Sequence, residues 1–174
     1  MPHRPSEAIG KAAGLAKAAK AVITGQRGIF KKLQQEHGEV SALMARVAAS
    51  SSEKVRRDLF PTIKQELLSH AKAEEKEFYA VLKRFDETKL MIPNSTAEHD
   101  DMEATLQELD GMDIAGEAWG NLFKKLVKKV QTHVREEEHD LFPKAQKVIS
   151  DTEAVDIEHR FLRQKEAELR KWTH

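Results

Sequence analysis

Apolar residues recur at steps of three and four along most of the chain, a spacing that places them on one face of an α-helix. From residue 28 onward this pattern predicts four successive helices, over 28–49, 53–85, 95–109 and a last stretch that starts between residues 113 and 120 and reaches Pro143. No stretch shows the alternation that is typical of a strand. The sequence therefore predicts an all-α protein whose long helices pack as a bundle.

Capping residues and prolines mark the expected helix boundaries. Ser52 is suited to cap the second helix, and Pro61 within that helix indicates either a kink or a short helix before the main one. Ser95-Thr-Ala-Glu98 has the form of a capping box, which predicts that the third helix starts there, and Asp110-Gly111 is expected to end it. Pro143 is expected to bend or end the fourth helix.

A fifth, amphipathic helix is expected over 152–172, with Asp151 as its cap. Its large apolar residues lie seven or three positions apart among many charges, at Val155, Leu162, Leu169 and Trp172. So narrow a seam predicts packing on the outside of the bundle or against a second subunit, as in a homodimer. The seam contains no acid–base pair, so no chemistry is assigned to it.

The first 27 residues differ in composition from the rest of the chain. They contain few sizeable apolar groups, and their basic residues outnumber the single acidic residue, Glu7. We interpret them as a basic arm, either disordered or forming a marginal helix, because so little apolar surface cannot offset the entropy cost of ordering. The chain is thus divided into this arm (1–27), the bundle (28–150) and the C-terminal helix (151–174).

Charge and composition exclude several classes of protein. The 29 basic residues equal the 29 acidic ones, so no excess of charge favours nucleic acid as a partner. Cysteine is absent, which excludes disulfides and thiolate chemistry and requires that any metal be held by nitrogen and oxygen. The sequence contains no run of about 18 apolar residues, so no transmembrane segment is predicted, and no secretory signal is evident. A cytoplasmic protein is therefore expected.

Two polar residues lie within the apolar face of the fourth predicted helix. His133 and Glu137 stand one turn apart in a stripe of leucines and valines. Burying a carboxylate without a partner costs several kcal/mol, so such a pair needs a compensating charge, usually a metal ion. A single histidine of this kind is more often an ordinary core residue, but the same motif recurs in the second helix at His70 and Glu74.

Each motif follows a lone histidine on the preceding helix, His37 or His99, at nearly the same separation. Both lone histidines also follow a glutamate. Residues one turn apart on a helix have Cβ atoms about 6 Å apart, so the histidine and the glutamate of a motif can converge on one ion. Four histidines and two glutamates exceed the needs of one tetrahedral zinc and suit a pair of octahedral ions that share the carboxylates.

The order His37, His70-x-x-x-Glu74, His99, His133-x-x-x-Glu137, with Leu-Phe-Pro at 141–143, resembles the hemerythrin-like HHE cation-binding proteins over about residues 28–150. This resemblance implies an antiparallel up-down-up-down four-helix bundle with a non-haem di-iron centre, oxo- or hydroxo-bridged, in its core. It also implies that His37 and His70 bind one iron, that His99 and His133 bind the other, and that Glu74 and Glu137 bridge them. Zinc and manganese are the less favoured metals.

One position departs from the oxygen carriers of that family. They have a second histidine four residues after the first in the third helix, where this chain has Glu103. A carboxylate there adds negative charge and favours the ferric state, which works against reversible oxygenation. Glu103 is therefore a candidate seventh metal ligand, and the alternative is a surface residue at the edge of the apolar stripe.

The sequence leaves three functions open. The preferred one is a di-iron protein that binds or senses dioxygen, a related small molecule, or iron. The second is an enzyme that decomposes peroxide, catalase-like or peroxidase-like, and the third is a metal-stabilised helical interaction module. Whether the protein is an enzyme is left open, because the sequence says little about the groups that surround the metal ligands.

Overall fold

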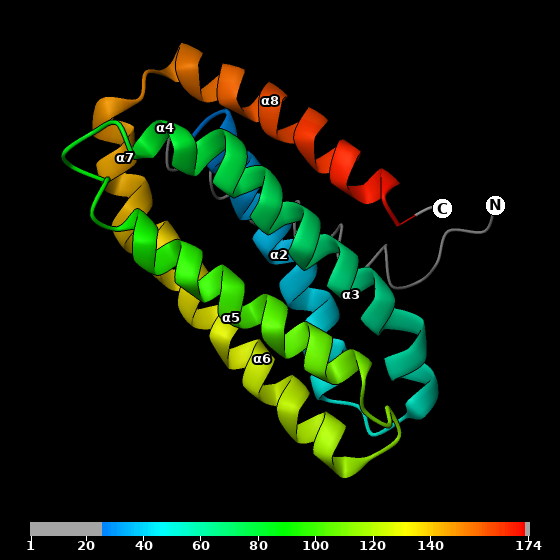
Figure 1. Ribbon diagram of the computed structural model, residues 1–174. Helices are drawn as coiled ribbons and strands as arrows, with labels where there is room; N and C mark the ends of the chain where they lie inside the picture. Colours follow the sequence, from blue (N-terminus) through cyan, green and yellow to red (C-terminus); the bar gives the residue numbers. More distant parts are fainter. Residues whose placement is uncertain (1–25, 173–174) are drawn as a thin grey trace.

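The computed structural model describes residues 26–172, so the predicted basic arm lies outside the described residues except for Gln26 and Arg27. Within the described range the chain is helical and contains no strand. The four longest helices of the bundle are α2 (Ile29–Ala48), α3 (Glu53–Glu74), α5 (Ile92–Asp110) and α6 (Glu117–Glu136). Figure 1 shows that they run alternately up and down, which confirms the prediction of an up-down-up-down bundle.

The helix α2 follows the predicted apolar stripe and begins after Gly28. The φ angle of Gly28 is 54°, in the left-handed region that favours glycine. A Cβ atom at this position would also lie 2.4 Å from the backbone carbonyl carbon of Ala154, in the helix α8 (Asp151–Arg170). Glycine is therefore required both by the turn and by the close approach of the last helix.

The helix α3 begins where predicted, because the Ser52 hydroxyl accepts a hydrogen bond from the backbone N–H of Val55. It continues without interruption through Pro61, whose side chain is exposed. The alternative of a separate short helix before the main one is therefore wrong. A proline removes one backbone donor, and the helix tolerates this loss on its solvent side.

The helix α5 starts earlier than the capping-box pattern predicts. It begins at Ile92 with Pro93 in its first turn, and Ser95 lies inside it, where the hydroxyl donates a hydrogen bond to the carbonyl of Met91. The predicted cap at Ser95 is wrong, because proline in the first turn, where the backbone N–H has no helical partner anyway, can start the helix instead. The predicted end at Asp110 is confirmed.

Both motif helices widen into a π-helical turn at their motif glutamates. These turns are η1 (Glu75–Tyr79) after α3 and η2 (Glu137–Leu141) after α6, and they lead into the short helices α4 (Ala80–Leu82) and α7 (Phe142–Val148). A π-helical turn holds one extra residue, so two neighbouring side chains can both point to the interior. The sequence analysis did not predict these turns.

The path from α6 to α8 is almost continuously helical. Pro143 lies in the first turn of α7, a position that proline favours, so the helical path continues through it. The last helix is capped by Ser150, whose hydroxyl accepts a hydrogen bond from the backbone N–H of Glu153 at 3.2 Å. The predicted cap, Asp151, is instead the first residue of α8.

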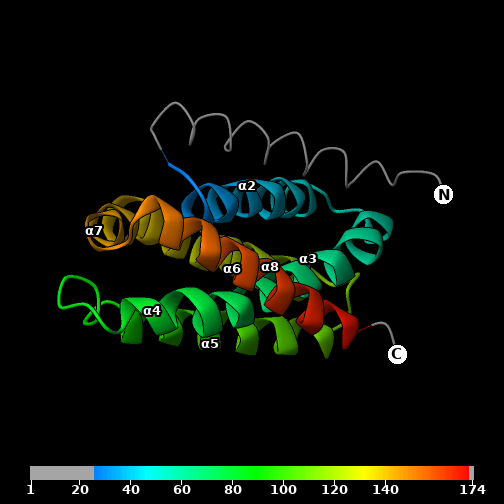
Figure 2. The same cartoon turned by 90° about the horizontal axis from the view of Figure 1, so that it is seen from above.

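The helix α8 packs along the outside of the bundle, against α2, α3 and η1 (Figures 1 and 2). Its buried residues are Ala154, Ile157, Phe161 and Lys165. The apolar seam that the sequence predicted is not the face that packs, because three of its residues are exposed: Val155, Leu162 and Trp172. The prediction that this helix packs on the outside of the bundle is confirmed.

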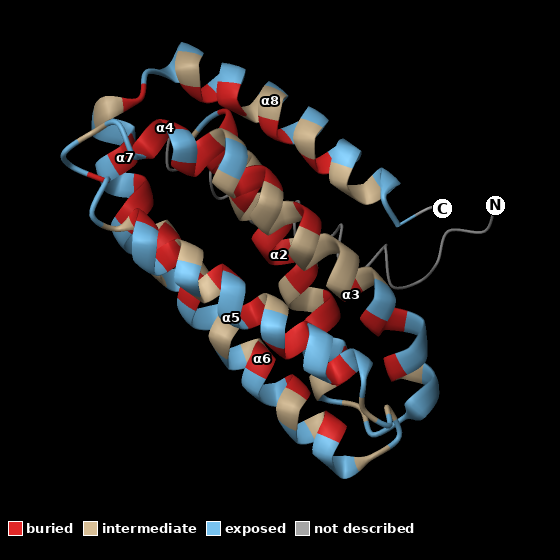
Figure 3. Ribbon diagram, in the orientation of Figure 1, coloured by how far each residue is buried: buried red, intermediate tan, exposed pale blue. Residues whose placement is uncertain are grey.

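The buried side chains form two apolar clusters that follow one another along the bundle (Figure 3). One joins the start of α2 to α4, α7 and α8, and the other joins the end of α2 to the start of α6. Along α2, Leu33 belongs to the first cluster and Val40 to the second, and His37 lies between them. A buried polar layer therefore separates the two clusters.

Candidate metal centre

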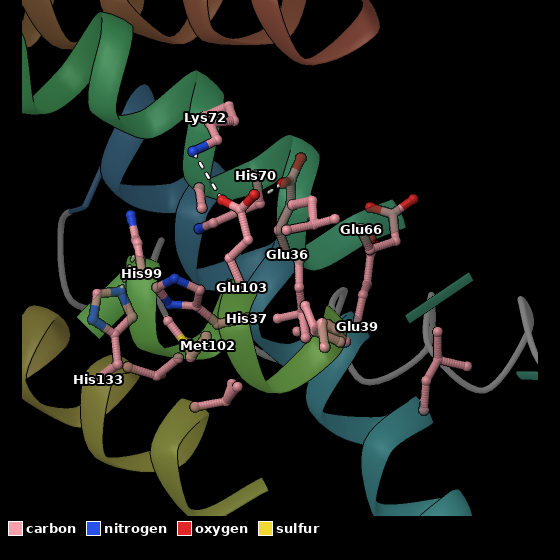
Figure 4. A pocket seen from close by; sticks show the side chains of 18 of the residues that line it. Glu36, His37, Glu39, Glu66, His70, Lys72, His99, Met102, Glu103 and His133 are labelled. Atoms are coloured by element: carbon pink, nitrogen blue, oxygen red, sulfur yellow. Dashed lines mark hydrogen bonds and ion pairs between the residues drawn. The ribbon is translucent and has the colours of Figure 1, made fainter. Parts of the chain in front are cut away.

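The structure brings six of the predicted ligands together in this polar layer: His37, His70, Glu74, His99, His133 and Glu137. Figure 4 shows the four histidines. The Oε2 atom of Glu74 lies 3.5 Å from Nε2 of His70 and 3.5 Å from Nε2 of His99. The Oε2 atom of Glu137 lies 3.4 Å from Nε2 of His37 and 3.5 Å from Nε2 of His133. Each carboxylate thus faces one histidine from each half of the sequence repeat.

The imidazoles also approach one another in pairs. The Nε2 atoms of His99 and His133 are 3.0 Å apart, and the ring centroids of His37 and His70 are 5.1 Å apart. Ligand atoms of Glu74, His99 and His133 all lie within 4.8 Å of one another. The imidazoles therefore lie in two pairs, and each carboxylate faces one imidazole of either pair.

The outer nitrogen of each imidazole is paired with a further glutamate. The Nδ1 to oxygen distances are 2.9 Å for His37 and Glu138, 3.0 Å for His70 and Glu36, 2.9 Å for His99 and Glu75, and 2.7 Å for His133 and Glu98. These contacts leave Nε2 of each ring directed to the interior. A carboxylate on Nδ1 fixes the ring orientation and the tautomer, and it makes Nε2 a more basic ligand.

The sequence repeat explains the positions of these outer glutamates. Glu36 and Glu98 precede the lone histidines, and each contacts the motif histidine of its own half. Glu75 and Glu138 follow the motif glutamates, and each contacts the lone histidine of the other half. The π-helical turns allow both members of each Glu-Glu pair to point inward. The sequence pattern had drawn attention to the two that precede the lone histidines, but no role in the centre was predicted for any of the four.

One aromatic position distinguishes the two halves. The ring of Tyr79 stacks on His99 and the ring of Phe142 stacks on His37, with centroids 5.5 Å and 6.4 Å apart. The Tyr79 hydroxyl donates a hydrogen bond to Oε1 of Glu137, whereas Phe142 has no hydroxyl to donate. Burial raises the pKa of Tyr79 well above its usual value, and Glu137 adds to this effect, so the hydroxyl stays protonated.

Several buried nitrogen and oxygen atoms of this cluster have no hydrogen-bond partner within the described residues. They are Nε2 of His37 and His70, both carboxylate oxygens of Glu74, and Oε2 of Glu137. The two glutamates are almost completely buried, and these oxygens have only imidazoles 3.4–3.5 Å away to offset the cost of several kcal/mol for a buried ionised carboxylate. Bound cations among these atoms would satisfy them. The residues therefore fit a metal centre.

Charge pairing shifts the pKa values of the centre in the metal-free protein. Burial disfavours the imidazolium of His70, but nearby carboxylates, Glu74 above all, outweigh it and raise the pKa of His70 to about 10. The pKa of His133 is also raised, because Glu137 and other carboxylates outweigh burial. Burial alone would raise the pKa of Glu137, but the neighbouring histidines lower it. A metal ion must therefore displace protons from these imidazoles.

A cavity of about 200 Å³ adjoins the centre and is lined by the four imidazoles. Its remaining wall is mostly apolar and includes Val40, Leu43, Leu67, Met102, Leu106 and Val130. Glu103 also lines the cavity, and its carboxylate lies 3.0 Å from Nζ of Lys72, with both side chains partly exposed. The structure thus places the seventh predicted ligand in an ion pair with a lysine, and its role as a ligand stays a prediction.

Sequence reasoning missed Lys165, which α8 carries into the surroundings of the centre. Its Nζ lies 2.7 Å from Oε2 of Glu36 and 2.6 Å from Oε2 of Glu66, and the side chain is buried. The sequence analysis assigned no chemistry to the apolar seam of this helix, and Lys165 lies outside that seam. The only signal in the sequence was a lysine one turn after the core residue Phe161, within a segment rich in charges.

The remaining histidines have no part in the centre as far as the structure describes them. His139 and His159 are exposed, and His174 and His3 lie outside the described residues. His139 thus lies on a different face of the helical path from the buried His133.

A family model described as the Hemerythrin HHE cation binding domain matches residues 28–145. The matched range contains the six residues of the centre and Glu103, and it ends before α8. No curated protein and no solved structure matches the chain. Among the helices of residues 26–172, none is long and apolar enough to cross a membrane.

Proposed function

Since this chain belongs to the hemerythrin HHE cation-binding domain family, we propose that its centre holds two iron ions and binds a small molecule such as dioxygen. The observation that carries this proposal is the set of buried donor atoms without partners on His37, His70, Glu74 and Glu137. Such atoms destabilise an apolar core, and bound cations turn the same atoms into favourable contacts.

In the proposed assignment, His37 and His70 bind one ion, and His99 and His133 bind the other. The contacts of Glu74 support a bridging role, because it faces His70 on one side and His99 on the other. The contacts of Glu137 with His37 and His133 support the same role. The glutamates on Nδ1 then hold each imidazole with Nε2 directed to its ion.

The donor set favours iron. Four imidazoles and two carboxylates without a thiolate suit non-haem iron, whereas structural zinc takes four ligands in tetrahedral geometry. Manganese suits a site richer in carboxylates and water. Six side chains are too few to fill two octahedral ions, so coordination positions stay free for other ligands. Iron bound there supplies a reversible change of oxidation state and open positions for a small molecule.

The cavity beside the centre supports a small, uncharged ligand. Its volume of about 200 Å³ is below the range of about 300–1,000 Å³ that is usual for drug-sized ligands. Leucines and valines form much of its wall, and the charged groups that line it are mostly carboxylates, so the cavity favours an uncharged molecule over an anion. Dioxygen meets both conditions, and hydrogen peroxide meets them as well.

The experiment that tests the proposed function is an optical one. Protein produced with iron and purified in air is expected to be yellow to brown, to lose this colour on removal of oxygen, and to regain it in air. A colour that persists without oxygen, together with oxygen evolution from added peroxide, would instead support the peroxide-decomposing enzyme. A colourless protein that contains zinc would contradict the proposal and support a structural metal.

A matched pair of variants shows whether the colour comes from this centre. His133→Ala removes a proposed ligand and is expected to abolish the reversible absorption change. His139→Ala removes an exposed imidazole from the next turns of the same helical path and is expected to retain the full change. Equal spectra for the two variants would place the absorbing ion elsewhere.

A further inference from the structure

Lys165 is a buried cation whose ammonium contacts the outer ligand sphere of the centre directly. Its Nζ and Nδ1 of His70 share one oxygen atom, Oε2 of Glu36, at 2.7 Å and 3.0 Å. The second oxygen of Glu36 lies 3.2 Å from Nζ of Lys32. A carboxylate that is 6% exposed and contacted on both oxygens is held in one orientation, and so is the imidazole that it contacts.

The helix α8 covers the same imidazole with an aromatic ring. Phe161, one turn before Lys165, meets His70 edge to face with ring centroids 5.6 Å apart. Residues of one helix thus contact both the ring of His70 and the glutamate that orients it. This helix lies beyond residue 145, where the family match ends, so the family match does not account for these contacts.

The equivalent glutamate of the other half, Glu98, has different surroundings. It contacts Nδ1 of His133 at 2.7 Å, but its side chain is 26% exposed. Its other contacts are with the Asn94 amide and the acidic Glu136, and within the described residues no lysine or arginine forms an ion pair with it. The glutamate behind His70 therefore contacts two lysines and is enclosed, whereas the one behind His133 has only the imidazole as a cationic partner within the described residues and is partly exposed.

We propose that Lys165 is a positioning residue for the metal ligand His70, acting through Glu36, and that it makes the two metal positions unequal. This inference rests on the proposed metal centre. The helix α8 is then part of the centre, although it supplies no ligand itself.

Removal of the ammonium has a specific expected effect. Glu36 and Glu66 both lie within 2.7 Å of Nζ, so without it the buried carboxylate of Glu36 faces that of Glu66, whose side chain is 37% exposed. Their repulsion, together with the cost of a buried charge, moves Glu36 away from His70 and toward Lys32. His70 then loses the contact that orients its ring, while His99 and His133 keep theirs.

The test is a titration of the metal-free, full-length protein with Co²⁺, followed by visible absorption and by competition with a chelator. The wild-type protein is expected to take up two Co²⁺. In Lys165→Met, one Co²⁺ should bind about 10- to 100-fold more weakly, the usual cost of losing a group that supports a metal ligand, and the other should bind as before. Lys165→Arg retains the cation and should restore the affinity for the weakened ion.

Two controls separate positioning from the docking of α8. Lys76 donates a hydrogen bond to Gln164 of α8 at 2.8 Å and is exposed, so Lys76→Met weakens docking without reaching the centre and should leave both Co²⁺ affinities unchanged. Glu98→Gln should weaken the Co²⁺ that Lys165→Met leaves unchanged. Circular dichroism checks that each variant stays helical, and Lys165→Gln replaces the methionine variant if that one unfolds.

The outcomes decide between three explanations. Two unchanged affinities in the neutral Lys165 variants would overturn the inference. Equal weakening of both ions, also seen in Lys76→Met, would overturn it in favour of a docking role alone. A wild-type protein that fails to bind two Co²⁺ would contradict the proposed centre itself, and the inference with it.

Discussion

The two halves of the centre share the same arrangement of candidate ligands and differ in the residues that surround these ligands. In both halves a lone histidine, a motif histidine and a motif glutamate face inward, and a glutamate lies on each Nδ1. The two halves differ in the residues next to this arrangement. Tyr79 stands where the other half has Phe142, and Lys165 stands behind Glu36 where Glu98 has no lysine.

This comparison separates what holds a metal from what distinguishes its two positions. The repeated residues account for the converging donor atoms, since they occur in both halves at equivalent places. The unrepeated residues account for the differences in hydrogen bonding, charge and hydration between the halves. Changes to the repeated set should therefore affect metal content, and changes to the unrepeated set should affect one position or the stability of the metal-free protein.

The largest effect is expected from removal of a motif histidine in either half. In the metal-free protein, His70→Ala and His133→Ala should each lower the free energy of unfolding by about 3–5 kcal/mol, because a buried carboxylate loses its charged partner. Both should also lower metal content. Urea unfolding and metal analysis measure these effects, with the exposed His139→Ala as the control. Unchanged unfolding in both variants would contradict a buried, charged cluster.

The pH dependence of stability should differ between metal-free and metal-loaded protein. The pKa of His70 is raised to about 10, so its stabilising contribution is complete below its ordinary pKa of about 6.5 and is lost as the pH rises through 10. The metal-free protein should therefore lose a few kcal/mol between pH 6.5 and 10. Metal ions replace these protons, so loaded protein should lose much less. Urea unfolding at pH 6.5 and 9.5 measures both losses. If the metal-free and the metal-loaded protein lost the same free energy of unfolding between these pH values, the prediction would be wrong.

Tyr79→Phe should make the two halves alike at this aromatic position. The variant removes the hydrogen bond to Oε1 of Glu137 and leaves the aromatic ring, so the metal-free protein should be less stable by about 1.5–3 kcal/mol, the range for a hydrogen bond to a charged group. Metal content should not change. Thermal unfolding and metal analysis measure the two quantities. Phe142→Leu serves as a comparison, because it removes the ring that stacks on His37 together with its contacts to Phe30 and Phe78. A loss of metal in Tyr79→Phe would show that the hydroxyl does more than support Glu137.

The smallest effect is expected from Glu103→Gln. Its carboxylate pairs with Lys72 at the partly exposed rim of the cavity, and such ion pairs contribute about 0–1 kcal/mol. Stability and metal content should therefore stay close to those of the wild-type protein. The loss of one metal ion per chain would instead identify Glu103 as a seventh ligand.

The sequence predicted the parts of the fold that depend on periodicity. Apolar spacing predicted the bundle, and the repeated motif predicted that the six residues converge. Both patterns are spacings within single helices, so they can be recognised in the sequence. The start of α5 was predicted wrongly, because Ser95-Thr-Ala-Glu98 has the form of a capping box while Pro93 starts the helix, and Glu98 contacts His133 instead. A local pattern cannot show that its last residue has a partner on another helix.

Contacts between distant segments account for what the sequence did not reveal. The π-helical turn at Glu75 depends on contacts of both Glu74 and Glu75 with other helices, and the pairing of Lys165 with Glu36 depends on how α8 lies over the bundle. Lys165 resembles the other lysines of a charged segment in the sequence. Its burial follows from tertiary packing, about which helical periodicity carries little information.

The central claim is that six side chains surround two cations inside the bundle. Anomalous diffraction at the iron absorption edge, from crystals of protein loaded with iron, tests it most directly. The account predicts two anomalous peaks, one beside Nε2 of His37 and His70 and the other beside Nε2 of His99 and His133, with Glu74 and Glu137 between them. Peaks only at surface carboxylates, or none within this cluster, would contradict the account.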